Sequence, residues 1–136
     1  MQKSYELLLG ELLQVASEEV EAAGTLRTDR ARAAQAVRVG IGRLKFEVLS
    51  RETRARLGTP WAPLNDLDAT QYLVLQKHNW TIEYVKGLSR DQLMFALAQE
   101  IHDLQLPEDA RAAAKGWATR YGVWDELKDH LDDPAP

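Results

Sequence analysis

The chain has 136 residues, a formal net charge of −4 and no cysteine. This length is that of one ordinary domain and suffices for a hydrophobic core without covalent staples. The lack of cysteine excludes disulfides, thiolate metal ligands and a cysteine nucleophile, and no apolar run approaches the ~18 residues of a membrane span. The N-terminal residues lack the pattern of a signal peptide, so we expect a cytoplasmic protein with no membrane partner.

The first predicted element is an amphipathic helix over residues 4–23. Its apolar positions recur at three- and four-residue spacing, at Tyr5, Leu8, Leu9, Leu12, Ala16, Val20 and Ala23. Ser4 is a suitable N-cap, and Gly24 stands where a left-handed residue commonly ends a helix. The remaining face is acidic.

Residues 37–48 fit two structures. A β-hairpin with its turn at Gly42-Arg43 places six apolar residues on one face. A helix places an apolar seam at Ala34, Val37, Ile41, Leu44 and Val48, although each interior glycine costs about 1 kcal/mol. Because a lone hairpin is marginal and no other strand is evident, we favour the helix and keep the hairpin as the alternative. If this segment is a helix, Gly40 and Gly42 mark either the close approach of another helix or a kink. Ser50 is a candidate start of a separate helix.

The segment 27–56 is basic, with nine basic and three acidic residues. Its net charge is therefore +6, which leaves −10 on the rest of the chain. Arg32, Arg43 and Arg54 recur every eleven residues on one side of the helical seam, and Arg38 and Lys45 follow the other side. These five residues are candidates for binding nucleic-acid phosphates. The competing interpretation is that they pair within the fold, with the acidic first helix lying antiparallel to the second.

A proline-containing loop at 58–66 follows, and it carries Trp61. Asp66 or Asp68 is the expected cap of a short helix that ends at 78–79. Thr81 is the expected cap of a very short helix, with Trp80 and Val85 as a hydrophobic staple.

Three further helices are predicted towards the C-terminus. Ser89 and Gln92 form a capping box for a helix that reaches about residue 104. Pro107 opens the next helix, which Gly122 ends, and a last helix covers 124–131. The sequence therefore predicts an all-α, irregular bundle of five to seven helices, with one domain over 1–131 and a frayed tail at 132–136.

No catalytic or metal-binding motif frames the polar residues. The three histidines stand far apart, and neither a zinc-protease nor a nucleophile-elbow pattern is present. We therefore predict no catalytic residue, no metal, no cofactor and no enzymatic activity.

The four tryptophans indicate where a partner could bind. Trp80 and Trp117 lie on apolar stripes and are predicted to be core residues. Trp61 and Trp124 are the candidate partner-binding residues, because tryptophan is enriched at interface hot spots. We expect a small non-enzymatic intracellular protein that binds another protein as an adaptor, inhibitor or assembly subunit. Nucleic-acid binding through 27–56 is the alternative, and a homo-oligomer is left open.

Overall fold

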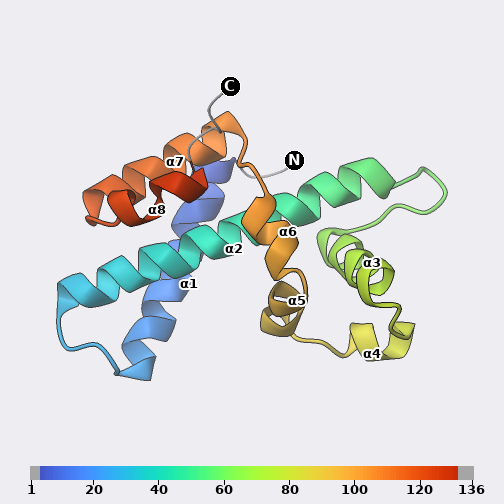
Figure 1. The fold of residues 1–136 in the computed structure, drawn as a ribbon, viewed down its shortest axis with the longest axis horizontal. Helices are drawn as coiled ribbons and strands as arrows, with labels where there is room; N and C mark the ends of the chain where they lie inside the picture. Colours follow the sequence, from blue (N-terminus) through green and yellow to red (C-terminus); the bar gives the residue numbers. More distant parts are fainter. Residues whose placement is uncertain (1–3, 132–136) are drawn as a thin grey trace. The chain divides into compact units, whose positions relative to one another are not determined.

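The computed structural model describes residues 4–131, and these residues form eight helices and no β-strand (Figure 1). The helices are α1 (Tyr5–Ala23), α2 (Asp29–Leu57), α3 (Asp66–His78), α4 (Ile82–Lys86), α5 (Arg90–Ala96), α6 (Ala98–Asp103), α7 (Glu108–Arg120) and α8 (Trp124–Leu131). The predicted all-α fold is confirmed, with one helix more than the upper expected number. The predicted tail at 132–136 lies outside the described residues.

Helix α2 contains all of residues 37–48, so the hairpin alternative is wrong. The predicted seam is at most 9 % exposed along its whole length, at Ala34, Val37, Ile41, Leu44 and Val48. Burial of this seam offsets the roughly 2 kcal/mol that two interior glycines cost. The helix also continues through Ser50, whose hydroxyl donates a hydrogen bond to the main-chain oxygen of Phe46 at 3.0 Å. Ser50 therefore does not start a separate helix.

Most of the predicted helix ends are found where the sequence placed them. The Ser4 hydroxyl caps α1, and Gly24 ends it with φ of 64°. The Thr81 hydroxyl caps α4, and Ser89 and Gln92 form the expected capping box of α5. Local hydrogen bonding to free main-chain groups thus fixes these boundaries.

Two boundaries differ from the prediction. Helix α3 is capped by Asn65, and Asp68 is the third helical residue that bonds back to the cap. The helix expected to run on from Ser89 divides into α5 and α6 at Leu97, where φ is −107° and ψ is 20°. Leu97 is only 1 % exposed, so the break coincides with a side chain that packs in the core.

The chain forms two compact units, and α2 contributes to both. Unit 1 contains α1, α2 up to Leu44, α7 and α8, and unit 2 is Lys45–Leu104. Within unit 1, α1 crosses α2 and does not lie antiparallel along it as expected (Figure 1). A Cβ atom added to Gly40 would lie 2.6 Å from Leu13 Cδ2. Gly40 is therefore the predicted close-approach point.

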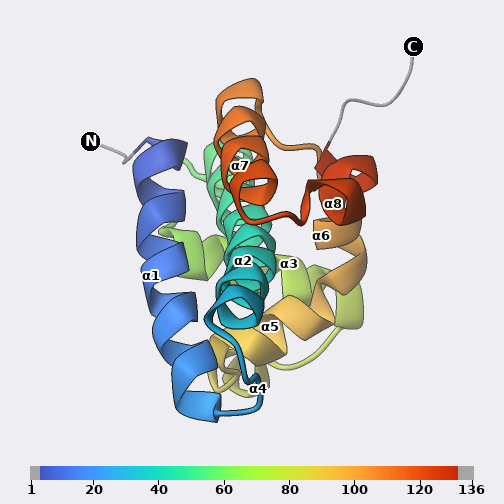
Figure 2. The ribbon, with the colours of Figure 1, turned by 90° about the vertical axis from the view of Figure 1, so that its left-hand side faces the viewer.

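Small side chains dominate the core of unit 1, where α1 contacts α7 and crosses α2 (Figures 1 and 2). Six buried alanines contribute to it, at positions 16, 34, 36, 110, 114 and 118. Leu9, Leu13 and Leu44 supply the larger buried groups. Short side chains permit short distances between helix axes, so long helices can pack closely here.

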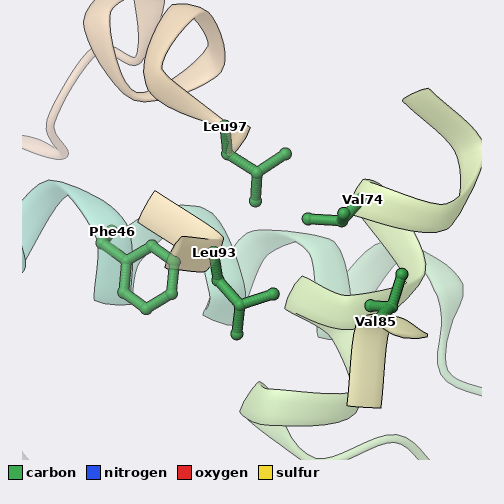
Figure 3. Close-up of a cluster of buried hydrophobic side chains, with 5 residues drawn as sticks. All are labelled: Phe46, Val74, Val85, Leu93 and Leu97. Atoms are coloured by element: carbon green, nitrogen blue, oxygen red, sulfur yellow. The ribbon is translucent and has the colours of Figure 1, made fainter. Parts of the chain in front are cut away.

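Larger side chains form the core of unit 2. Phe46 of α2, Val74 of α3, Val85 of α4 and Leu93 and Leu97 at α5 gather in one buried cluster (Figure 3). Each is at most 6 % exposed. The cluster therefore fixes α3, α4 and α5 on the second half of α2, and this arrangement positions the groove described next.

Candidate functional site

A groove of about 630 Å³ lies on unit 2 between the end of α3, α4 and α5. Its apolar lining is Trp80, Tyr84, Leu88, Phe95 and Ala96, and its polar lining is Lys77, His78, Asp91 and Gln92. We call it the aromatic groove. A hollow of this size, mostly apolar with a few polar groups, has the character of a ligand or peptide site.

The local sequence explains how the rings come together. Asn79 ends α3 in the left-handed conformation, with φ of 55°, and Thr81 caps α4 two residues later. Trp80 lies in this tight connection and stacks on His78, with ring centroids 4.3 Å apart and planes 14° apart. Tyr84 meets Trp80 edge to face at 5.1 Å and 81°. The rings therefore hold one another in fixed orientations.

Hydrogen bonds fix the polar side of the aromatic groove. His78 Nε2 lies 3.2 Å from the main-chain oxygen of Ala96, so the ring below Trp80 is tied to the end of α5. Lys77 Nζ lies 3.1 Å from the same oxygen and 3.0 Å from a carboxylate oxygen of Glu100. An apolar floor with a polar, hydrogen-bonded edge is the usual anatomy of a protein interface.

The aromatic lining is accessible to solvent: Phe95 is 86 % exposed, Tyr84 57 % and Trp80 39 %. The prediction that Trp80 is a core residue is wrong. Only Val85, the other member of the predicted staple, is fully buried, because α4 is one turn long and directs a single residue into the cluster. Adjacent exposed aromatic side chains mark interaction surfaces in soluble proteins.

The two predicted partner-binding tryptophans lie outside the aromatic groove. Trp61 is 85 % exposed, in a tight turn closed by main-chain hydrogen bonds between Thr59 and Ala62. Trp124 begins α8 in unit 1 and is partly buried, with Lys115 Nζ 5.0 Å from its ring centroid. The structure thus presents Trp61 to solvent, but it does not join Trp61 and Trp124 in one site.

The five candidate nucleic-acid-binding residues all have partners within their own unit. They are Arg32, Arg38, Arg43, Lys45 and Arg54. Arg32 pairs with Asp29, Arg38 with Glu126 and Arg43 with Glu19. Lys45 donates a hydrogen bond to the main-chain oxygen of His102, and Arg54 pairs with Asp66. Arg43 and Lys45 are also buried, at 8 % and 6 % exposure. Only Arg43 pairs with the acidic α1, so the charge complementarity is spread over several elements.

Lys45 has a structural explanation. Its Nζ donates to the main-chain oxygen of His102 at 3.2 Å, at the end of α6. A cation there satisfies a free carbonyl and complements the helix dipole. Burial lowers the pKa of Lys45, and the nearby charge of Asp103 partly opposes this effect.

A smaller cavity of about 260 Å³ in unit 2 brings two carboxylates together. Glu47 and Asp66 line it with the hydroxyls of Ser50 and Thr70, which lie 2.5 Å apart. Each hydroxyl also has a main-chain carbonyl within hydrogen-bonding distance. Neither hydroxyl is therefore arranged as a nucleophile beside a general base.

The charges around this cavity are partly balanced. Arg54 Nη1 lies 3.1 Å from Asp66 Oδ1. That buried oxygen nevertheless has no partner with hydrogen-bond geometry, so the contact is an ion pair without a directed hydrogen bond. Burial raises the pKa of Glu47, and the charge of Asp66 adds to this effect. The cavity can hold a small polar group, but its cations and anions leave no strong preference for either charge.

Comparison of the chain with family models, with curated proteins and with solved structures finds no match. Within residues 4–131, no group of three or more His, Asp or Glu side chains is placed to hold a metal ion. Of the helices in that range, none is both long and apolar enough to cross a membrane. The described residues therefore form an all-α protein, and the aromatic groove is the hollow that gathers the exposed aromatic side chains Trp80, Tyr84 and Phe95.

Proposed function

We propose that the protein is a non-enzymatic, intracellular binding protein, and that it binds a segment of another protein in the aromatic groove. The observation that carries this proposal is the exposure of Phe95, Tyr84 and Trp80 around one hollow. Aromatic side chains at the centre of an interface contribute most of its binding energy when a partner removes them from water.

The chemistry of the groove indicates the kind of segment that it binds. A mostly apolar lining that also includes Asp91 and Lys77 suits a short peptide that inserts one or two large apolar side chains and bonds at its flanks. Because the ring contacts among His78, Trp80 and Tyr84 are already formed, binding costs little side-chain ordering. Trp61 is a further exposed aromatic residue of unit 2, outside the groove, and remains a candidate contact.

The test is affinity capture from cells of the source organism with the complete chain as bait. Phe95→Ala is expected to reduce recovery of a stoichiometric partner at least tenfold, since a hot-spot aromatic contributes about 2 kcal/mol or more. Tyr72→Ala is the matched control, because Tyr72 is 40 % exposed on α3 and does not line the groove. The proposal fails if no stoichiometric partner is recovered, or if both variants recover it equally.

Nucleic-acid binding through 27–56 has less support as an alternative. It would require residues such as Arg38 and Arg54 to exchange their carboxylate partners for phosphates. It predicts salt-sensitive binding of DNA or RNA. Flat fluorescence anisotropy with both nucleic acids at low salt removes it.

A further inference from the structure

A second surface lies on α1 of unit 1, whose course is seen in Figure 2. A shallow hollow of about 600 Å³ runs there along α1 alone, lined by Glu6, Leu7, Gly10, Glu11, Gln14 and Val15. We call it the α1 face. Leu7 and Val15 are 55 % and 42 % exposed, so apolar area on the α1 face is in contact with water.

Gly10 is the feature of the α1 face that the fold does not explain. It lies in the interior of α1, where glycine is one of the least favourable residues. A Cβ atom added to Gly10 would have nothing within 4 Å, whereas one added to Gly40 would collide with Leu13. The described chain therefore has room for a side chain at Gly10, which also borders a smaller hollow lined by Trp117 and Tyr121 of α7 and its end. On the α1 face, the missing side chain of Gly10 leaves main chain at the floor of the hollow, which a second helix can approach closely.

The charge of α1 selects the kind of helix that fits. Between Tyr5 and Ala23 the chain has five glutamates and no basic residue. Glu6 and Glu11 line the hollow, and Glu18 continues the same side through its hydrogen bond with Gln14 at 3.2 Å. A partner surface with lysine or arginine on both sides of an apolar stripe is complementary to this pattern. The α1 face of a second copy would present like charges.

We propose that the α1 face docks a basic amphipathic helix of another protein, with its closest approach at Gly10. Leu7 and Val15 contact the apolar stripe of that helix, and the glutamates pair with its cationic flanks. This site uses residues of unit 1 only, so it does not depend on the aromatic groove.

The test uses a synthetic amphipathic helix as the probe, about 18 residues long and built from leucine and lysine, so that it spans roughly 27 Å. Binding of the labelled peptide to the complete protein is followed by fluorescence anisotropy. Gly10→Gln is expected to weaken binding at least tenfold and to raise Tm by a few degrees, since glutamine favours a helix more than glycine does. Loss of binding in a more stable protein cannot result from unfolding.

Gly42→Ala is the matched control, because Gly42 is also a helix-interior glycine whose added Cβ would have nothing within 4 Å. It is expected to raise Tm and to leave the peptide affinity unchanged. A peptide with glutamate in place of lysine is expected not to bind. Equal affinity of Gly10→Gln and the native protein overturns the proposal, as does equal binding of the two peptides. A native dimer that Gly10→Gln dissociates identifies a second copy as the occupant and also overturns it.

Discussion

Units 1 and 2 use their apolar residues differently. Among the described residues, unit 1 buries six alanines and exposes only two large apolar side chains, Leu7 and Val15. Unit 2 buries a single alanine, Ala69, and exposes seven large apolar side chains, including every exposed aromatic of the described chain. Long helices with small contact residues can bury nearly all of their apolar surface.

The short helices of unit 2 cannot do the same. Helix α4 is five residues long, so it directs Val85 into the core and leaves Trp80 and Tyr84 on the surface. The buried cluster of unit 2 forms without these rings. They are therefore available to a partner, and the following predictions test this division between core and surface.

The largest expected loss of stability follows from a substitution in the core of unit 2. Leu93→Ala removes a side chain that is 1 % exposed and is expected to lower the free energy of unfolding by about 2–5 kcal/mol, because a cavity remains. Urea unfolding followed by circular dichroism measures it. Leu67→Ala is the control, since Leu67 is 55 % exposed and its loss should change stability by less than about 0.5 kcal/mol. Equal effects would show that the assignment of core and surface is wrong.

The next largest change in stability is expected from substitutions where α1 crosses α2 in unit 1. Gly40→Val is expected to destabilise by about 1–3 kcal/mol, because its side chain would overlap Leu13. Gly42→Ala, two residues away in open space, is expected to stabilise by up to about 1 kcal/mol. Opposite shifts of the urea midpoint confirm the crossing, and shifts of the same sign contradict it. We expect one transition for both units, because α2 is continuous through Leu44 and Lys45.

A smaller effect is expected at the ion pair between α1 and α2. The Arg43 side chain is 10 % exposed and that of Glu19 is 48 % exposed. Arg43 Nη1 is buried and has no hydrogen-bond partner, so Glu19 supplies most of the compensation for this charge. Glu19→Gln is expected to destabilise by about 1–2 kcal/mol, discounted for the exposure of the carboxylate. Glu18→Gln, one residue away and exposed, serves as the control in urea unfolding. Equal losses of stability in the two variants would contradict a special role of Glu19 beside Arg43.

The smallest effect concerns pH and Glu47. Burial raises the pKa of Glu47, Asp66 raises it further, and Arg51 and Arg90 oppose the shift. The folded state therefore binds more protons than the unfolded state, and this contribution to stability is lost as pH rises from the unfolded pKa through the folded pKa. Glu47→Gln is expected to raise the urea midpoint at neutral pH and to change it least near about pH 4. The exposed Glu52, changed to Gln, is the control. A lower urea midpoint of Glu47→Gln at neutral pH would contradict the raised pKa of Glu47.

Local patterns in the sequence predict much of the fold. The seam from Ala34 to Val48 and the caps at Ser4 and Ser89 depend on neighbouring residues, and the structure confirms them. The break at Leu97 was not predicted, because it depends on packing against Val74 and other residues distant in the sequence.

The aromatic groove could not be predicted as a whole, since it requires α3, α4 and α5 to meet. One local signal was available. Phe95 lies off the buried stripe that Leu93 and Leu97 define, and an aromatic side chain on the polar face of an amphipathic helix indicates a contact surface. The prediction that Trp80 is a core residue rested on its apolar stripe and its staple with Val85, but the one-turn helix α4 directs only Val85 into the cluster.

The most direct test of the central claim is site-specific photo-crosslinking in cells of the source organism. A photoreactive phenylalanine analogue replaces Phe95 in the aromatic groove or Tyr72, an exposed residue of α3 that does not line this groove. We predict one discrete heavier adduct from position 95 and none from position 72, because Phe95 lines the groove and Tyr72 does not. No adduct from position 95, or the same adduct from both positions, would contradict a partner-binding role of the aromatic groove.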